Sequence, residues 1–351
     1  MVESLDVIRN ITSIEPDIVQ QAQERLDILT KPQGSLGMLE DLAKKIVAIT
    51  GNINPTLKEK AIFTLAADHG VVEEKVSAFP QEVTKQMVYN FLKGGAAINV
   101  LAKHVGARIV VADVGIAGDL EPHQDLLVNK IGYGTANMAV GPAMTRADAL
   151  RSIDAGIKMF EEDLKNGIDV VGTGEMGIGN TTSASAITAV LTTASVEDVV
   201  GRGTGVDDKG LSNKIDVIKK AIAANSPDPD DPIDVLAKIG GFEIGGLAGI
   251  ILAAASNRIP IVIDGFISGA ASLIAYHLEP TVKNYMIAGH CSAEKGHRVI
   301  LDHIGLDPVL DLNMRLGEGT GAVLAFSLLE ASTKILTRMA TFEDADVSTK
   351  E

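Results

Sequence analysis

The chain has 351 residues, of which 46% are apolar and only 3% aromatic, and it contains 35 glycines. This length suits one large α/β unit or about two smaller domains, with a core of Ala, Val, Ile and Leu packed closely around glycine. The formal net charge of -15 argues against a nucleic-acid binder or an anionic-membrane binder, since both need basic surface.

Sequence features also bear on the compartment. The single cysteine, Cys291, excludes an intramolecular disulfide and any CxxC metal or redox motif. The N-terminal stretch MVESLDVIRNITSIEPD lacks the basic and apolar regions of a secretory signal, and the longest apolar run, 244–256, is shorter than the roughly 20 residues that span a bilayer. We therefore expect a cytoplasmic protein with no membrane partner.

Both ends of the chain show helical patterns without strands. Residues 1–45 and the residues after about 320 are of this kind. We expect these two segments to pack together as a small helical domain, beside a large α/β catalytic domain over about 46–319.

Between these ends, short apolar runs alternate with longer helical patterns such as residues 81–104. Runs that are apolar on both faces predict strands covered on both sides, hence a parallel sheet flanked by helices in a Rossmann-like α/β fold. Polar residues, among them Asp264, end these runs, at the edge of the sheet where such folds bind ligands. The predicted strands are 61–68, 107–115, 168–174, 259–265 and 284–289.

The stretch IDVVGTGEMGIGNTT, residues 168–182, contains G-x-G-x-x-G after a predicted strand. This pattern is the fingerprint of dinucleotide-binding folds, so a nicotinamide-dinucleotide oxidoreductase is one hypothesis. Two features count against it: Glu175 would face a pyrophosphate, and Glu197, the acid about 20 residues further on, does not follow a strand. A weaker prediction survives, in which the helix start at Asn180 and Thr181 offers free N–H groups to an anion.

A second glycine-rich turn, VVGRGTGVDDKGLSNK, spans residues 199–214. Backbone N–H groups near Gly203, together with the ammonium group of Lys214, could form a phosphate cradle. The stretch lacks the GK[ST] ending of a nucleoside-triphosphate loop, and a plain surface turn is an equally good interpretation.

The histidines, and the search for a covalent nucleophile, give weaker evidence for a functional site than these glycine-rich turns. His69 and His290 follow predicted strands, but no HExxH or comparable metal spacing accompanies them, which favours structural histidines. No GxSxG elbow predicts a covalent nucleophile. The heptapeptide RLGEGTG, residues 315–321, instead places one carboxylate, Glu318, between glycines that allow close approach of backbone and ligand. Taken alone, this is either a site or a glycine-rich turn whose Glu faces water.

Seven stretches, in order, resemble the nicotinate-nucleotide:dimethylbenzimidazole phosphoribosyltransferase family. They run from near the N-terminus almost to the end of the chain, so the resemblance covers most of it. The stretches are LTKPQGSLGMLEDLA (29–43), AADHGVVEEKVSAFPQEVTKQM (66–87), GTGEMGIGNTT (172–182), KIGGFEIGGLAGIILAAA (238–255), IDGFISGAA (263–271), HCSAEKGH (290–297) and RLGEGTGA (315–322).

The resemblance implies transfer of the 5-phosphoribosyl group of nicotinate mononucleotide to 5,6-dimethylbenzimidazole or a related base. The transfer inverts the anomeric carbon and gives nicotinate and α-ribazole 5'-phosphate for the cobalamin nucleotide loop. The resemblance also implies a homodimer, a parallel sheet with a small helical domain, and no metal or other cofactor. A non-catalytic nucleotide sensor that uses the same phosphate cradle is the third hypothesis.

The resemblance also assigns residues. Glu318 is the general base, and Glu175 lines the phosphoribosyl site. Some relatives carry Ser and Gln where this chain has Phe79 and Met87, which predicts a base pocket that selects more by shape than by hydrogen bonding. The base pocket is expected to contain Phe79, Met87, Met176 and Leu316, and the nucleotide site Gly174, Gly177, Asn180, Thr181, Gly203, Lys214, Asp264, Ser292 and Arg315.

Overall fold

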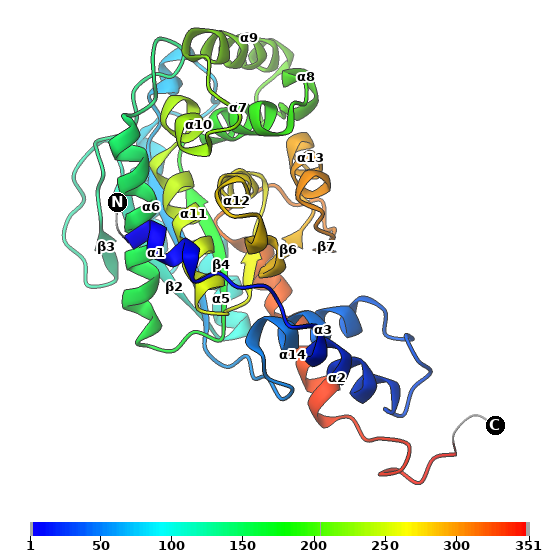
Figure 1. The fold of residues 1–351 in the computed structure, drawn as a ribbon. Helices are drawn as coiled ribbons and strands as arrows, with labels where there is room; N and C mark the ends of the chain where they lie inside the picture. Colours follow the sequence, from blue (N-terminus) through cyan, green and yellow to red (C-terminus); the bar gives the residue numbers. More distant parts are fainter. Residues whose placement is uncertain (1–2, 204, 349–351) are drawn as a thin grey trace.

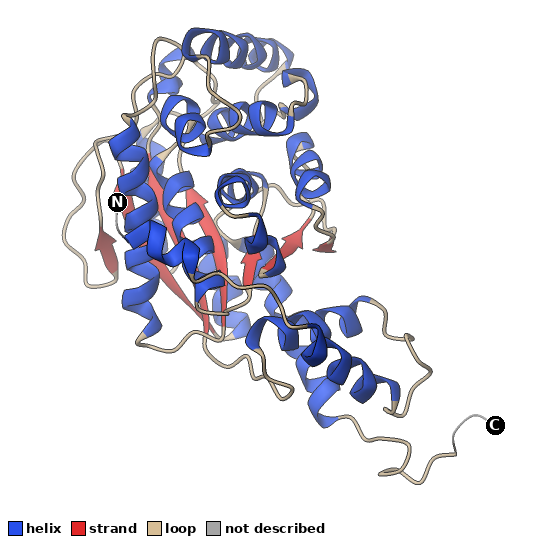
Figure 2. Cartoon of the chain, viewed as in Figure 1, coloured by secondary structure: helices blue, strands red, loops and turns tan. Residues whose placement is uncertain are grey.

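The structure, a computed structural model, describes residues 3–203 and 205–348. Within these residues a seven-stranded sheet runs in the order β3-β2-β1-β4-β5-β6-β7, and all six neighbouring pairs are parallel (Figures 1 and 2). This confirms the predicted parallel sheet of an α/β fold. The strands are β1 (Lys60–Ala67), β2 (Ala107–Gly115), β3 (Leu126–Val128), β4 (Val170–Met176), β5 (Ile261–Ile263), β6 (Met286–His290) and β7 (Pro308–Leu310).

Five of these strands fall on the predicted runs: β2 coincides with its run, and the ends of the other four are shifted by one or two residues. The sequence prediction missed β3 and β7, which form the two edges of the sheet. Each is three residues long. β5 is equally short, but it is fully buried within a longer apolar run. β3 and β7 are partly exposed and have no such run, so pairing with a neighbouring strand decides them.

Strand β1 contributes side chains to two hydrophobic clusters, one on each face of the sheet. Ala61, Phe63 and Leu65 point into one hydrophobic cluster, while Ile62 and Ala66 point into the other. Successive side chains of a strand face opposite sides, so a strand covered on both faces is apolar throughout. All eight β1 residues are accordingly buried.

Helices cover both faces of this sheet (Figures 1 and 2). On one face, α6 (Arg146–Leu164) packs on α11 (Phe242–Ser256), which lies on β1, β2 and β4. Gly156 and Gly246 permit this, because a Cβ on Gly156 would lie 1.9 Å from the Gly246 carbonyl oxygen. The other helices beyond β4 are α7 (Asn180–Thr192), α8 (Val196–Val199), α9 (Asp208–Asn225), α10 (Pro232–Ile239), α12 (Phe266–Leu278) and α13 (Lys295–Ile304).

On the opposite face lie α4 (Glu82–Leu92), α5 (Ala97–Val105) and the first half of α14 (Thr320–Arg338). The continuous helix expected over 81–104 is thus two helices. Gly94, with φ +75°, ends the first of them, since this backbone conformation is open to glycine and breaks a helix. There are also two short 3-10 helices, η1 (Gly70–Glu74), which follows β1, and η2 (Pro280–Asn284), which packs against α11 and α12.

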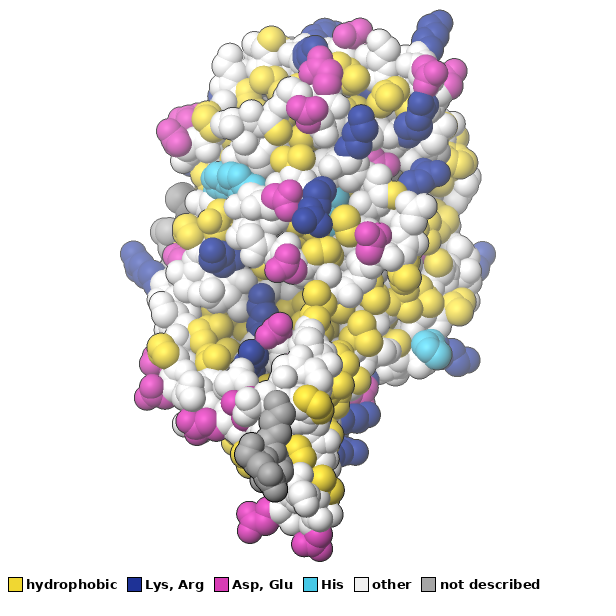
Figure 3. All heavy atoms as spheres, turned by 90° about the vertical axis from the view of Figure 1, so that its right-hand side faces the viewer, with side chains coloured by type: hydrophobic (Ala, Val, Ile, Leu, Met, Phe, Trp, Pro, Cys, Tyr) yellow, Lys and Arg dark blue, Asp and Glu magenta, His cyan; other side chains and the backbone are white. Residues whose placement is uncertain are grey.

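The terminal helices divide between two places. Helices α2 (Pro16–Asp27) and α3 (Met38–Thr50) pack with the end of α14 and project from the main body (Figures 1 and 3). Helix α1 (Glu3–Arg9), which was expected to join them, packs against α6 and α11 instead. Because α14 begins on the sheet and ends in the projection, a boundary at about residue 320 stays a prediction. No helix in the described part of the chain is long and apolar enough to cross a membrane.

Candidate active site

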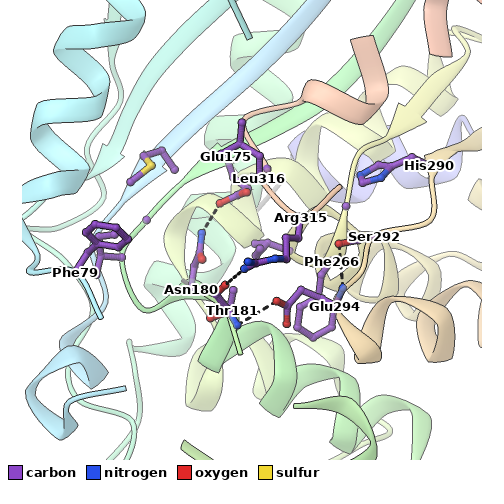
Figure 4. Close-up of a pocket in the computed structure, with 17 residues that line it drawn as sticks. Phe79, Glu175, Asn180, Thr181, Phe266, His290, Ser292, Glu294, Arg315 and Leu316 are labelled. Atoms are coloured by element: carbon purple, nitrogen blue, oxygen red, sulfur yellow. Dashed lines mark hydrogen bonds between the residues drawn. The ribbon is translucent and has the colours of Figure 1, made fainter. Parts of the chain in front are cut away.

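The sheet order determines where a ligand site can form. From β1 the chain adds strands on one side, and from β4 on the other, so the crevice of the sheet lies at the carboxyl ends of β1 and β4. A cavity of about 460 Å³ lies there. Its wall includes Glu175 and Met176 from the end of β4, Gly265 after β5, and His290 at the end of β6 (Figure 4).

One part of the cavity is rich in donors for an anion. Helix α7 begins there with Asn180 and Thr181, and no side chain caps its first turn. The Lys214 ammonium group donates to the Thr181 hydroxyl at 2.7 Å. Lys214 therefore stands behind Thr181 and does not line the cavity. Its side chain is 1% exposed, and burial lowers its pKa to about 8.

The same part of the cavity includes the second glycine-rich turn. The Gly203 N–H donates to the Glu294 carboxylate at 3.0 Å, and Arg315 donates to the Gly203 carbonyl oxygen at 3.0 Å. The Ser292 hydroxyl accepts from the Glu294 N–H at 3.3 Å. Residues from three distant segments thus meet at one turn, as Figure 4 shows. Gly203 thus lines the cavity, while Arg202, Gly205 and Asp207 of the same turn are exposed at the surface. The phosphate cradle stays a prediction.

The other part of the cavity is apolar. Phe79, Met176, Ile178 and Leu316 line it, and Phe79 lies at the opposite end from Ser292 in Figure 4. Phe79 and Leu316 are 52% and 57% exposed, so this end opens to solvent. Met87 does not line the cavity; it packs against the buried cluster beneath α4.

Glu175 lies between the two parts. Its carboxylate accepts a hydrogen bond from the Asn180 amide (Figure 4). Burial, followed by the negative charges of Asp264 and Glu243, raises the pKa of Glu175 to about 8. This group is therefore largely protonated at neutral pH.

A stability measurement tests this assignment. Between pH 4.5 and about 8 the folded state holds a proton on Glu175 that the unfolded state has lost, so the free energy of unfolding falls as pH rises through that window. Glu175→Gln should remove this loss, on the order of a few kcal/mol, and gain stability over wild type at pH 8.5 but not at pH 4.5. Urea unfolding at both pH values measures it. Glu161→Gln, on the exposed face of α6, is the control, and an equal response of both variants contradicts the assignment.

The loop RLGEGTG has an unusual backbone. Gly317, Glu318 and Gly319 have φ of +84°, +65° and +96°. For a glutamate this left-handed conformation costs about 1–3 kcal/mol, and such strain persists where the surrounding structure holds it. A Cβ on Gly174 of β4 would lie 2.4 Å from the Glu318 carbonyl oxygen. The loop therefore lies directly on β4.

Asp264 holds this loop in place. Its carboxylate accepts from the N–H groups of Gly319 at 3.2 Å, Gly321 at 2.6 Å and Ala322 at 2.9 Å. These N–H groups belong to the loop and the first turn of α14, where a carboxylate is favourable. Asp264 is 1% exposed and does not line the cavity. Its place is beneath the loop, not beside a nucleotide.

The Glu318 side chain is buried, with 5% exposed, immediately behind the cavity wall formed by Gly317. Its carboxylate accepts from the Ile98 N–H at the start of α5, at 3.2 Å. Burial raises the pKa of Glu318, and the Ile98 hydrogen bond opposes that effect. The guanidinium group of Arg315, three residues earlier in the chain, donates to the Gly203 carbonyl oxygen. The glutamate of this loop does not face water.

The geometry removes the support for the dinucleotide fingerprint. Gly172 and Gly174 lie inside β4, not in the turn that follows it. A Cβ on Gly172 would meet Ile62 at 2.4 Å, and a Cβ on Gly177 would meet the Ala67 carbonyl at 2.4 Å. Gly172 and Gly174 therefore serve packing within the protein and do not approach a ligand. Gly177, in the turn after β4, does line the cavity, as predicted.

Three residues that line the cavity were not predicted as site residues. The sequence patterns did not indicate Glu294 or Phe266, and they favoured a structural role for His290. Their positions after β5 and β6 are the one signal that could have indicated them. His69 is structural, as expected: it contacts Ser183 at 3.1 Å and Glu243 at 2.7 Å and is fully buried.

Comparisons with known proteins agree with this arrangement. The sequence model of a phosphoribosyltransferase family matches residues 11–347. Relatives named nicotinate-nucleotide:dimethylbenzimidazole phosphoribosyltransferase include one from Desulforudis audaxviator, 58% identical over 98% of this chain and 99% of its own length. Another from Geobacter metallireducens is 56% identical over 97% of each chain.

A solved structure extends the likeness to three dimensions. The crystal structure of CobT from Thermus thermophilus superimposes with a TM-score of 0.93 at 47% identity, over 95% of this chain and 100% of that one. Identity at this level over nearly the whole length leaves no part of the cavity outside the match. The chain belongs to the nicotinate-nucleotide:dimethylbenzimidazole phosphoribosyltransferase family.

Proposed function

We propose that this protein transfers the 5-phosphoribosyl group of nicotinate mononucleotide to 5,6-dimethylbenzimidazole or a related base. The products are nicotinate and α-ribazole 5'-phosphate. The observation that carries the proposal is one cavity with an anion-binding end, an apolar end and a buried carboxylate between them, in a chain that matches this family throughout. The substrate's phosphate belongs beside Thr181 and Gly203, and the incoming base beside Phe79, Met176 and Leu316.

The chemistry requires one base. The azole nitrogen forms a bond to the anomeric carbon while the bond from that carbon to the pyridinium nitrogen breaks, and nicotinate keeps the electron pair of that bond. The leaving nitrogen is already positively charged, so it needs no proton. The azole becomes cationic unless its other N–H is removed, and a carboxylate that takes this proton is a general base.

Glu318 is our candidate for this base. The proposal requires its carboxylate to turn from the Ile98 N–H towards the cavity, past Gly317. Glu175 is the candidate for stabilising positive charge that develops on the sugar, which it does once ionised. Binding of the pyridinium cation favours that ionisation, because opposite charges lower the pKa of a carboxyl group.

One assay separates the three hypotheses: release of nicotinate from nicotinate mononucleotide in the presence of candidate bases. The proposed transferase releases nicotinate only when a benzimidazole is present. A nucleotide sensor binds the nucleotide and releases nothing. An oxidoreductase binds NAD tightly by calorimetry and shows no base-dependent release.

Lys214 should act on substrate affinity. We expect Lys214→Met to raise the KM for nicotinate mononucleotide roughly 10- to 100-fold with little change in kcat, since it removes the ammonium group that donates to Thr181 beside the proposed phosphate position. Methionine keeps most of the volume of the buried side chain. Lys209→Met, on the exposed first turn of the same helix, is the control, and an unchanged KM in Lys214→Met would contradict this role of Lys214.

We further propose a homodimer, in which a second copy covers the exposed Phe79 and Leu316 at the mouth of the cavity. Sedimentation equilibrium of the purified chain tests it. A cytoplasmic location stays a prediction from the sequence.

A further inference from the structure

Glu294 is a charged residue of the cavity wall that the proposed chemistry leaves without a role. It is the N-cap residue of α13, yet its side chain makes no hydrogen bond to that helix. It reaches instead to the Gly203 N–H, at 3.0 Å, on a turn 91 residues away in the chain. Glu294 is 7% exposed.

The surroundings of this carboxylate are those of an anion site. Glu294 and Lys214 meet at Gly203: its N–H donates to the Glu294 carboxylate at 3.0 Å, and a Cβ on it would lie 3.1 Å from the Lys214 ammonium nitrogen. The charge of Glu294 raises the pKa of Lys214, and the burial of Lys214 lowers it. The uncapped start of α7, at Thr181, is joined to Lys214 by a hydrogen bond. The donors proposed for the substrate's phosphate thus already surround a carboxylate.

The surrounding residues leave a specific space for the Glu294 carboxylate. A Cβ on Gly201 would lie 1.8 Å from the Glu294 Oε2 atom, so the carboxylate fits because residue 201 is glycine. Oε2 is buried and has no hydrogen-bond partner among the described residues. A buried carboxylate oxygen without a donor raises the free energy of the folded protein. The Glu294 carboxylate can therefore leave this position when another anion binds the same donors.

We propose that Glu294 occupies the phosphate position in the empty enzyme and that the phosphate of the substrate displaces it. The proposal rests on the function proposed above. A phosphate and a carboxylate cannot share the Gly203 N–H without strong repulsion, so the carboxylate leaves as the phosphate enters. Inorganic phosphate alone lacks the base and ribose contacts that offset this displacement, and it therefore binds weakly. Glu294 in this way restricts the site to complete nucleotides.

The test compares inhibition by inorganic phosphate with the KM for nicotinate mononucleotide. Glu294→Gln keeps the shape and removes the charge. We expect its inhibition constant for phosphate to fall about tenfold or more and its KM for the nucleotide to fall by a smaller factor. Glu294→Asp keeps the charge and should show no such gain. Asp216→Asn, an exposed acid on the helix of Lys214, is the control for a general change in charge.

The outcomes distinguish this inference from the proposed function. Wild-type protein that releases no nicotinate with any base overturns the function. If wild type is active and Glu294→Gln binds phosphate no better than wild type, or less well, the displacement is refuted. Thermal unfolding of each variant identifies misfolded protein, and a crystal structure with nucleotide bound gives a second measurement: a Glu294 carboxylate still within hydrogen-bond distance of Gly203 N refutes it independently of kinetics.

Discussion

Replacement of Glu318 by Gln is expected to lower kcat by ~10²- to 10⁴-fold, with little change in the KM for nicotinate mononucleotide. Glutamine fills the same space and still accepts from the Ile98 N–H, so the loop stays in place, but it takes no proton from the azole. Steady-state nicotinate release with dimethylbenzimidazole measures the effect. Turnover near that of wild type would remove Glu318 from the mechanism.

The pH dependence of the wild-type enzyme supplies a second check on Glu318. A general base must be ionised, so kcat/KM falls as pH falls through its pKa. Because burial raises the pKa of Glu318, the acid limb should lie above 4.5, the ordinary value for this side chain. Glu175, whose pKa is about 8 and which must also be ionised, contributes a second acid limb. The residual activity of Glu318→Gln should keep the Glu175 limb and lack the one from Glu318, while Glu343→Gln, far along the chain in the C-terminal segment, should keep both.

Asp264→Asn is expected to lower the free energy of unfolding by about 2–4 kcal/mol and to lower kcat by tenfold or more. Asparagine offers one oxygen, which can keep the Gly321 and Ala322 hydrogen bonds, but its NH₂ group then faces the Gly319 N–H, donor against donor. The loop that carries Glu318 must shift, and a small shift of a catalytic group is costly in rate. Urea unfolding and turnover are measured on the same preparation.

The control for Asp264 is Asp302→Asn, which removes an exposed acid paired with Arg298 on α13. An exposed pair of this kind is worth less than about 1 kcal/mol. Equal stability of the two variants would mean that the three N–H groups find other acceptors. Unchanged kcat in Asp264→Asn would show that the position of Glu318 does not depend on this anchor.

Much of the site could be predicted from the sequence. Asn180 and Thr181 follow β4, Ser292 follows β6 and Arg315 follows β7, and all four line one cavity. The physical reason is that parallel strands bring their carboxyl ends to the same edge of the sheet, so residues after consecutive strands meet. The continuous apolar runs predicted β4 and β6 because these strands are buried on both faces, whereas the short, half-buried β7 was missed.

Other features required the tertiary structure. Gly174 is a glycine because the Glu318 loop lies against it, and Asp264 anchors that loop where the sequence predicted a nucleotide contact. Met87, on α4, packs against the buried cluster beneath that helix, and Glu294 turns from its own helix to a distant turn. Residue type and spacing determined which groups arrive at the edge of the sheet. Only packing between segments far apart in the chain decided which way each side chain points and which hydrogen-bond partner it finds, because those partners are not its neighbours in sequence.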